Sequence, residues 1–345
     1  MNKVLLILTG GTICMERSRE TGALRPATEE SFRAAVPELF ETPDTEVHLL
    51  SFTPLIDSSD VNPQDWKKMA QTIAKHYDDY DGFVILHGTD TMSYSGSALS
   101  FMLEGLNKPV VFTGSQLPIG VLRSDAKENL LTAIEIASAR DENNDAIVPE
   151  VTIYFESRLF RANRTTKRNA EHFAAFKSYN YPPLAQAGLH ITYNVHLVHY
   201  SDPKAKLKLH TDTDNHVVVL KLFPGITEQV VRSILHIRDL KAVVLETYGA
   251  GNAPSYKWLY KLLKEAVDKG IIIVNKTQCS TGMVDMELYE VSSNLIKAGV
   301  LSGFDITTEA LLSKLMYLLG EHPDNIERVK ILIQKDLCGE ITIHN

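Results

Sequence analysis

The fold is set out in the stretch VLLILTGGT, residues 4–12, where an apolar run ends in two glycines flanked by threonines. An unbroken apolar run of five residues is typical of a strand buried on both faces, as in a parallel sheet. The two glycines let the backbone turn sharply and let a ligand approach it closely. In open parallel sheets such turns lie in the crevice beyond the carboxyl ends of the strands, where ligands bind. Taken alone, the pattern also fits a structural turn with threonine caps.

Three later apolar runs end in polar turns of the same kind. The runs are Val47–Phe52, Phe83–His87 and Val110–Thr113, and the turns contain Asp57–Asp60, Gly88–Asp90 and Gly114–Gln116. The carboxyl ends of neighbouring parallel strands lie along one edge of a sheet. We therefore expect the hydroxyls of Thr12, Ser58 and Thr89 and the carboxylate of Asp90 to converge there.

Strand-like and helix-like segments alternate along most of the chain. Further strands are expected at 151–155, 217–222, 242–246 and 271–275, and helices at 63–77, 95–106, 123–139, 256–269, 307–319 and 325–334. The alternation predicts an α/β fold with a larger N-terminal, doubly wound, mainly parallel sheet domain and a smaller C-terminal α/β domain. Because the rhythm fails at about 188–215, we expect domains at 1–190 and 215–345 joined by a linker at 191–214.

The composition narrows the classes of function. With 345 residues, 44% hydrophobic and 23% charged, the chain resembles a folded protein of about two domains. The net charge of −8 argues against nucleic acid as the main partner. The three cysteines are far apart and provide neither a disulfide framework nor a metal motif. The first apolar run is too short for a signal peptide, and no run is long enough for a membrane span, so we expect a cytoplasmic protein without a membrane partner.

A threonine hydroxyl is a weak nucleophile at neutral pH and needs a proton acceptor nearby. The carboxylate of Asp90 and the amine of Lys167, which lies in the basic stretch Arg158–Arg168, are candidates. A lysine crowded by other cations, or desolvated, has a lowered pKa and can act as a base. A solvated basic loop is the alternative interpretation of the same stretch.

Six blocks of the sequence resemble, in order, the bacterial-type L-asparaginases, and most closely their cytoplasmic type I branch. They are TGGTI at 9–13, DSSD at 57–60, HGTDTM at 87–92, TGSQ at 113–116, NRTTK at 163–167 and YGAGNAP at 248–254. The resemblance extends from about residue 3 to about residue 340, nearly the whole chain.

This resemblance implies an amidohydrolase that converts L-asparagine and water to L-aspartate and ammonia. Thr12 matches the family's nucleophile, which attacks the side-chain amide carbon and forms an acyl-enzyme ester. Thr89, Asp90 and Lys167 match a second triad that activates the attack or the water, and backbone N–H groups near Thr89 would stabilise the oxyanion. No metal and no organic cofactor are implied, and a homodimer or homotetramer is expected.

The expected substrate-binding residues follow from the same resemblance. Ser58 and Ser59 match positions that hold the α-carboxylate, Asp90 also pairs with the α-ammonium group, and Ser115 lies near the side-chain amide. The glycines and the acidic residue that complete this set are Gly11, Gly88 and Asp57.

Three features differ from the family pattern or extend it. Where the family has a lid tyrosine, this chain reads TGALR at 21–25, and the flanking stretch Arg17–Glu20 is expected to be flexible and polar, as a lid needs. Asp285 and Glu287 are candidates for an acidic residue donated to a neighbouring subunit. The residues Thr166, Thr277 and Cys279 fit a second asparagine site that activates some type I enzymes.

Other functions stay open at this stage. A non-catalytic amino-acid-binding or sensor protein on the same scaffold is the main alternative. A nicotinamide or nucleotide enzyme is disfavoured because GxGxxG and P-loop motifs are absent, and a tRNA-dependent amidotransferase subunit is disfavoured by the acidic balance. Weak activity on glutamine is expected beside that on asparagine, since one methylene changes selectivity by only about 1–3 kcal/mol.

Overall fold

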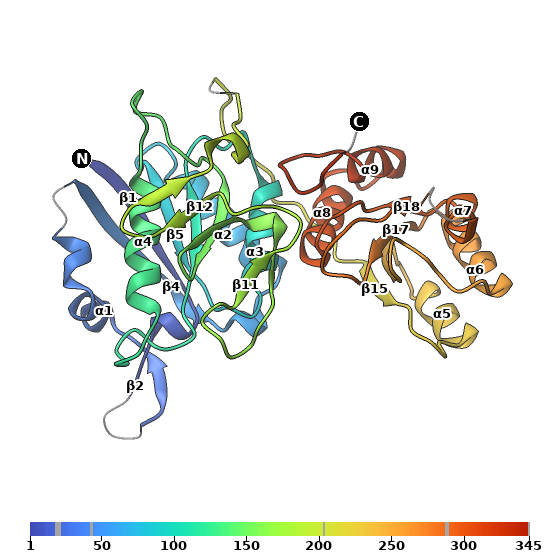
Figure 1. The fold of residues 1–345 in the computed structure, drawn as a ribbon, viewed down its shortest axis with the longest axis horizontal. Coiled ribbons are helices and arrows are strands. Elements are labelled where there is room, and N and C mark those ends of the chain that lie inside the picture. The colour runs from blue at the N-terminus through green and yellow to red at the C-terminus, as the bar shows by residue number, and fades with distance from the viewer. Residues whose placement is uncertain (18–21, 42–43, 203, 287–289, 344–345) are drawn as a thin grey trace. The chain divides into compact units, whose positions relative to one another are not determined.

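The computed structural model describes residues 1–17, 22–41, 44–202, 204–286 and 290–343. The chain divides into two compact units, Met1–Thr211 and Asp212–Asn345 (Figure 1). The segment expected as a linker contains β13 (Ile191–Tyr193), η5 (Val195–Leu197) and β14 (Lys208–Leu209), and its first 21 residues, 191–211, cluster with the first unit.

Among the described residues, the first unit holds an eight-stranded sheet in the order β13-β12-β9-β8-β7-β5-β1-β4. Five neighbouring strands are parallel, namely β8 (Val151–Phe155), β7 (Val110–Thr113), β5 (Gly82–Leu86), β1 (Asn2–Gly10) and β4 (Thr45–Ile56). The antiparallel extension consists of β9 (Arg158–Arg161), β12 (Ala185–Ala187) and β13. The strands expected from the apolar runs are confirmed, and β1 lies between β4 and β5.

The helices of the first unit include α1 (Glu29–Ala35), α2 (Pro63–Lys75), α3 (Met92–Met102) and α4 (Ala126–Ser138). Helix α2 begins with a capping box between Asn62 and Asp65 and has Pro63 at its first position, which are strong start signals. Short elements join these parts: η1 (Thr12–Cys14), β2 (Met15–Arg17), β3 (Leu24–Pro26), η2 (Pro37–Phe40), η3 (Ser58–Asp60), β6 (Leu103–Glu104), η4 (Ala162–Arg164), β10 (Thr165–Lys167) and β11 (Phe176–Ser178).

Strand β1 is buried on both faces, as its apolar run predicts. Val4, Leu6 and Leu8 share a core cluster with residues of α4, whereas Leu5 and Ile7 alternate with them and are also buried. A strand of this kind occurs where helices cover both faces of a parallel sheet.

The second unit repeats this architecture on a smaller scale. Its sheet consists of β15 (Val217–Lys221), β16 (Ala242–Thr247), β17 (Ile272–Thr277) and β18 (Leu301–Ser302), all parallel. One core cluster joins the sheet to α5 (Glu228–Leu235), α6 (Lys257–Asp268) and α7 (Glu290–Lys297), and another joins it to α8 (Thr308–Glu321) and α9 (Ile326–Ile333). The predicted two-part α/β fold is therefore confirmed. No helix of the described residues is long and apolar enough to cross a membrane.

Glycines bring the strand ends of the first sheet into backbone contact. A Cβ atom on Gly11, which has φ of +86°, would lie 2.4 Å from the Cα and N atoms of Gly88. A Cβ on Gly88 would lie 2.4 Å from Ser58 Oγ, and one on Gly114 would lie 2.4 Å from the His87 carbonyl oxygen. The loops after β1, β4, β5 and β7 therefore touch one another only because these positions have no side chain.

The second unit contains a fully buried ion pair. Lys314 Nζ lies 2.6 Å from Glu340 Oε1, and both side chains have 0% exposure. The ammonium group also donates to the carbonyl oxygens of Ile333 at 3.0 Å and Lys335 at 2.5 Å. The carboxylate accepts the backbone N–H groups of 337–338. Complete hydrogen bonding makes such a pair tolerable in a core, and here it joins α8 to the segment after α9.

We predict that Gly11→Ala lowers the free energy of unfolding by about 2–5 kcal/mol, because the methyl group clashes with backbone and φ is positive. Gly120→Ala is the matched control in the same unit, since its Cβ would meet nothing within 4 Å and its φ is not positive. The control should change stability by less than about 1 kcal/mol. Denaturant unfolding measures both, and equal effects would contradict the proposed backbone contact.

A second prediction concerns the buried ion pair. Lys314→Met leaves the Glu340 carboxylate buried without a cation, which we expect to cost about 3–5 kcal/mol of unfolding free energy. Lys264→Met, which removes an exposed partner of Asp268 at 2.8 Å, should cost less than about 1 kcal/mol. Thermal and denaturant unfolding of both variants tests the difference, and a Lys314→Met protein as stable as Lys264→Met would refute it.

Candidate active site

The two threonines of the first turn have different environments. Thr9 is buried, and its hydroxyl donates to the Leu86 carbonyl oxygen at 2.7 Å, which joins β1 to β5. Thr12 is half-buried at the start of η1, directly after the contact between Gly11 and Gly88. Among the described residues, the Thr12 hydroxyl has no hydrogen-bond partner. Thr9 is therefore a structural hydroxyl, whereas no hydrogen bond within the described residues uses the Thr12 hydroxyl.

Thr89, Asp90 and Lys167 lie together. Lys167 Nζ donates to Thr89 Oγ1 at 2.8 Å and to Asp90 Oδ1 at 2.7 Å. The Lys167 side chain is 18% exposed and that of Asp90 is 62% exposed, so solvent screens the carboxylate side of the pair. The Lys167 ammonium group thus connects the Thr89 hydroxyl and the Asp90 carboxylate, which are adjacent in sequence. The hydroxyl can both donate and accept hydrogen bonds, whereas the carboxylate only accepts.

Lys167 reaches this position by a reversal of the chain. Strand β9 runs antiparallel to β8, and the turn between them contains Glu156 and Ser157, whose φ angles are +47° and +59°. Elements η4 and β10 then follow, and β10 pairs with β11. The sequence placed Lys167 beyond the Val151–Phe155 strand but did not indicate this hairpin.

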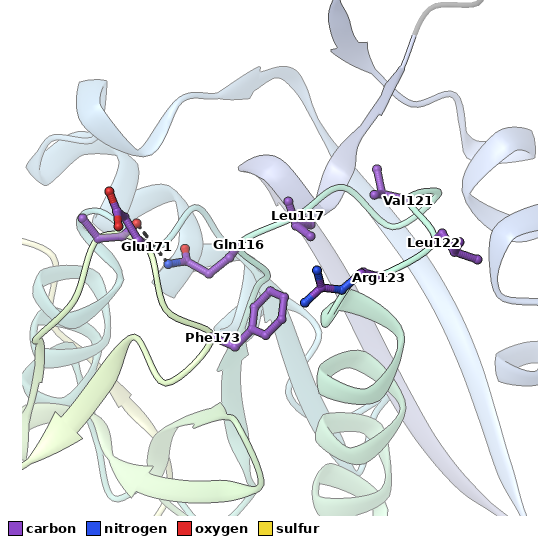
Figure 2. Close-up of a pocket in the computed structure, with 8 residues that line it drawn as sticks. Gln116, Leu117, Val121, Leu122, Arg123, Glu171 and Phe173 are labelled. Carbon is purple, nitrogen blue, oxygen red and sulfur yellow. Dashed lines mark hydrogen bonds between the residues drawn. The ribbon is translucent and has the colours of Figure 1, made fainter.

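The sequence indicates no role for Gln116, although the residue lies in one of the polar turns. Thr89 Oγ1 lies 3.3 Å from Gln116 Oε1, and Gln116 Nε2 donates to the carbonyl oxygens of Ala170 and His172 at 3.3 and 3.1 Å. Gln116 also lines an open pocket of about 550 Å³ together with Arg123, Glu171 and Phe173 (Figure 2). No pattern in a single sequence would have found this bridge.

The loop after β4 supplies the expected substrate-binding residues. Ser58 is buried against Gly88, and the Ser58 carbonyl oxygen accepts the Thr91 hydroxyl at 2.6 Å. The Asp57 carboxylate accepts the backbone N–H and the hydroxyl of Ser59, both at 2.9 Å. These bonds hold the pKa of the Asp57 carboxyl below its ordinary value, so it is an anion at neutral pH.

Ser115 lies in the loop after β7. It is buried, and its hydroxyl donates to the Leu117 carbonyl oxygen at 2.5 Å. The loop is held from α4, because Asn129 Nδ2 donates to the Gly114 carbonyl oxygen at 3.0 Å. In this state the Ser115 hydroxyl is used within its own turn.

His87 supports the Gly88 turn from the core. Its Nδ1 lies 2.7 Å from the Gly88 carbonyl oxygen and its Nε2 lies 2.9 Å from Ser95 Oγ, which accepts Trp66 Nε1–H at 3.1 Å. A carbonyl oxygen only accepts, so Nδ1 carries the proton. Burial lowers the pKa of His87 to about 4, so the ring is neutral and fixes the Gly88 peptide without adding charge.

The segment after Thr12 forms a hairpin. Strands β2 and β3 pair antiparallel, and Arg25 Nη2 lies 2.8 Å from Glu16 Oε1. Of the expected lid stretch, Arg17 belongs to β2, and residues 18–20 lie outside the described residues, as does Thr21. Leu24 and Arg25 belong to the 21–25 stretch where the family has its lid tyrosine, and both lie on β3.

The residues expected at a second site are divided between the units. Thr166 lies on β10 in the first unit. In the second unit, Thr277 Oγ1 donates to the Gly249 carbonyl oxygen at 2.5 Å and accepts the Cys279 backbone N–H at 3.0 Å, and Cys279 is exposed. Asp285 is also exposed, and Glu287 lies outside the described residues. Within the described ranges, no group of three or more His, Cys, Asp or Glu residues could hold a metal ion.

Comparisons with known proteins cover residues of both units. A family model described as "Asparaginase, N-terminal" matches residues 3–199, and "Glutaminase/Asparaginase C-terminal domain" matches residues 216–332. L-asparaginase 1 of Escherichia coli (strain K12) is 45% identical over 341 residues, 98% of each chain. A 60 kDa lysophospholipase of Mus musculus is 42% identical over 99% of this chain and 63% of its own length.

Solved structures agree with the sequence relatives. The crystal structure of L-asparaginase I from Vibrio cholerae O1 biovar eltor superposes with a TM-score of 0.89 at 42% identity, covering 99% of both chains. Both family models, the relative at 45% identity and this superposition cover nearly the whole length. The chain therefore belongs to the asparaginase family.

Proposed function

We propose that this chain is an L-asparaginase that hydrolyses L-asparagine to L-aspartate and ammonia. The observation that supports this best is the contact of Lys167 with both Thr89 and Asp90, next to the glycine-packed turn that carries Thr12. An amide hydrolase needs a nucleophile, a group that manages protons and a site for the developing oxyanion, and these residues can supply all three.

In the first half of the reaction, Thr12 Oγ1 attacks the side-chain amide carbon of asparagine. The hydroxyl proton passes to the leaving nitrogen, and the C–N bond breaks with release of ammonia. The product of this half is an ester between Thr12 and the β-carboxyl group. Backbone N–H groups near Thr89 would stabilise the oxyanion formed on the way. Because Thr12 makes no hydrogen bond among the described residues, its hydroxyl is available to a bound substrate.

In the second half, water attacks the ester carbon, and Thr12 leaves with a proton as aspartate forms. Thr89, held by Lys167 at 2.8 Å, is the proposed acceptor of a hydrogen bond from this water. The Lys167 charge is balanced by Asp90 at 2.7 Å, which keeps the ammonium group in place beside the hydroxyl. The two steps therefore use one nucleophile and one triad in turn.

The rest of the crevice would recognise the amino-acid part of the substrate. We assign the α-carboxylate to Ser58 and Ser59 and the α-ammonium group to Asp90, with the anionic Asp57 holding Ser59 in position. Gly11 and Gly88 would contribute backbone, and Ser115 the region of the side-chain amide. Glutamine, one methylene longer, would be a weak substrate at most.

Two further properties belong to this proposal. The family likeness supports a homodimer or a homotetramer. It also supports activation by asparagine at a second site, for which Thr166, Thr277 and Cys279 are the candidate residues. The hydrogen bonds of Thr277 to Gly249 and Cys279 give that part of the second unit a defined geometry.

We expect Thr12→Ala to lower the rate of ammonia release from asparagine by about 10³-fold or more, because the nucleophile is lost. Thr9→Val is the matched control, since it removes a neighbouring threonine hydroxyl that bonds only Leu86. It should cost about 1–3 kcal/mol of stability and leave the rate within a few-fold. A coupled ammonia assay measures both. A wild-type chain that binds asparagine without releasing ammonia would instead support an amino-acid-binding protein.

The second-site proposal predicts a sigmoidal dependence of rate on asparagine concentration. Thr277→Val should make the curve hyperbolic, because it removes the hydroxyl that bonds Gly249 and Cys279, whereas Cys338→Ala should leave the shape unchanged. A coupling of about 5- to 150-fold in affinity is the usual size of such effects. Initial rates over a wide concentration range test this, and hyperbolic kinetics in the wild type would refute it.

A further inference from the structure

We propose that Gln116 is a positioning residue that fixes the direction of the Thr89 hydroxyl. Its Oε1 lies 3.3 Å from Thr89 Oγ1, which also accepts a hydrogen bond from Lys167 Nζ at 2.8 Å. The inference rests on the proposed function, because it concerns the same hydroxyl. It adds a residue that contacts Thr89 from the neighbouring strand end and so controls how that hydroxyl is used.

The orientation of the Gln116 amide follows from its partners. Its Nε2 group lies 3.3 Å from the Ala170 carbonyl oxygen and 3.1 Å from that of His172. Carbonyl oxygens only accept hydrogen bonds, so the amide nitrogen must face them. A flipped amide would place an oxygen against two oxygens. Gln116 Oε1 therefore faces Thr89.

The direction of the Thr89 proton follows in turn. The Lys167 ammonium group can only donate, and the Gln116 amide oxygen can only accept. The Thr89 O–H bond consequently points to Gln116, and one lone pair accepts from Lys167. A hydroxyl oxygen has two lone pairs, so one is left for a proton of the attacking water. Without Gln116, the O–H bond could rotate into the space that this water needs.

Gln116 is itself held from two sides. Its backbone N–H donates to both carboxylate oxygens of Asp125, at 3.1 Å each, which fixes the main chain at the start of α4. The side chain lines the open pocket of about 550 Å³, so its rotamer depends on the hydrogen bonds to Ala170 and His172. The loop after Lys167, which contains Ala170 and His172, thereby orients the Gln116 amide, and the Gln116 amide in turn orients the Thr89 hydroxyl.

The test replaces Gln116 with methionine, which has a similar length and no amide. We expect kcat for asparagine to fall about 3- to 10-fold, the effect of losing one hydrogen bond in the transition state, while KM changes less than about twofold. Gln116→Leu should show the same loss and serves if the methionine variant does not fold. Thermal midpoints within a few degrees of the wild type identify folded variants.

Gln71→Met is the matched control, because it makes the same substitution at an exposed position of α2 in the same unit. We expect its kcat to stay within about twofold of the wild type. Equal losses in Gln71→Met and Gln116→Met, or an unchanged kcat in Gln116→Met, would overturn the positioning role. A wild-type protein that releases no ammonia would overturn the proposed function itself.

Discussion

The close approach of Gly11 and Gly88 is the constraint on which the crevice depends. Gly11 can approach the Gly88 backbone this closely only because it carries no Cβ atom, and Ser58 leaves no room for a Cβ atom on Gly88. The contact sets the separation of the loops after β1 and β5, and Ser58 also packs against Gly88. Thr12 and Thr89 each follow one of these glycines by a single residue. Their side chains are therefore placed by main-chain packing, which is stiffer than any arrangement of flexible side chains.

Polar groups around this contact divide into those used by the fold and those left for chemistry. Thr9 and His87 have all their polar atoms bonded to main chain or buried partners, and the lowered pKa of His87 keeps it neutral. Lys167 and Asp90 are paired at the solvent-accessible side of the crevice. Because the buried His87 ring is neutral and the charged Lys167 and Asp90 are paired, this part of the unit avoids the cost of a buried unpaired charge.

Much of the fold could be predicted because the local signals are strong. The apolar run of β1, the Asn62-Pro63 helix start and the alternation of strands and helices each point to one structure. The β8–β9 hairpin was not predicted, because its turn residues Glu156 and Ser157 are not among those that favour positive φ. The end of α3 also differed, since Leu103 continues an apolar pattern but pairs with β14.

For the candidate site, the sequence indicated which residue types gather at the sheet edge but not how they bond. That Lys167 contacts Thr89 depends on a hairpin and on η4, and that Gln116 contacts Thr89 depends on side-chain rotamers. Neither is encoded by spacing along a single chain. The family resemblance supplied the roles of Thr12, Thr89, Asp90 and Lys167, and these roles stay predictions.

The hairpin before Lys167 has a consequence for how the chain can change length. Loops at the free ends of strands tolerate inserted residues, because the added chain extends into solvent. In β9, by contrast, one inserted residue would exchange the two faces of the strand. It would also shift the start of η4 and β10, and the Lys167 amine would lose its place beside Thr89. We therefore expect relatives to differ in length outside the 151–167 segment. Within it, the number of residues between the sheet and Lys167 sets the position of the amine.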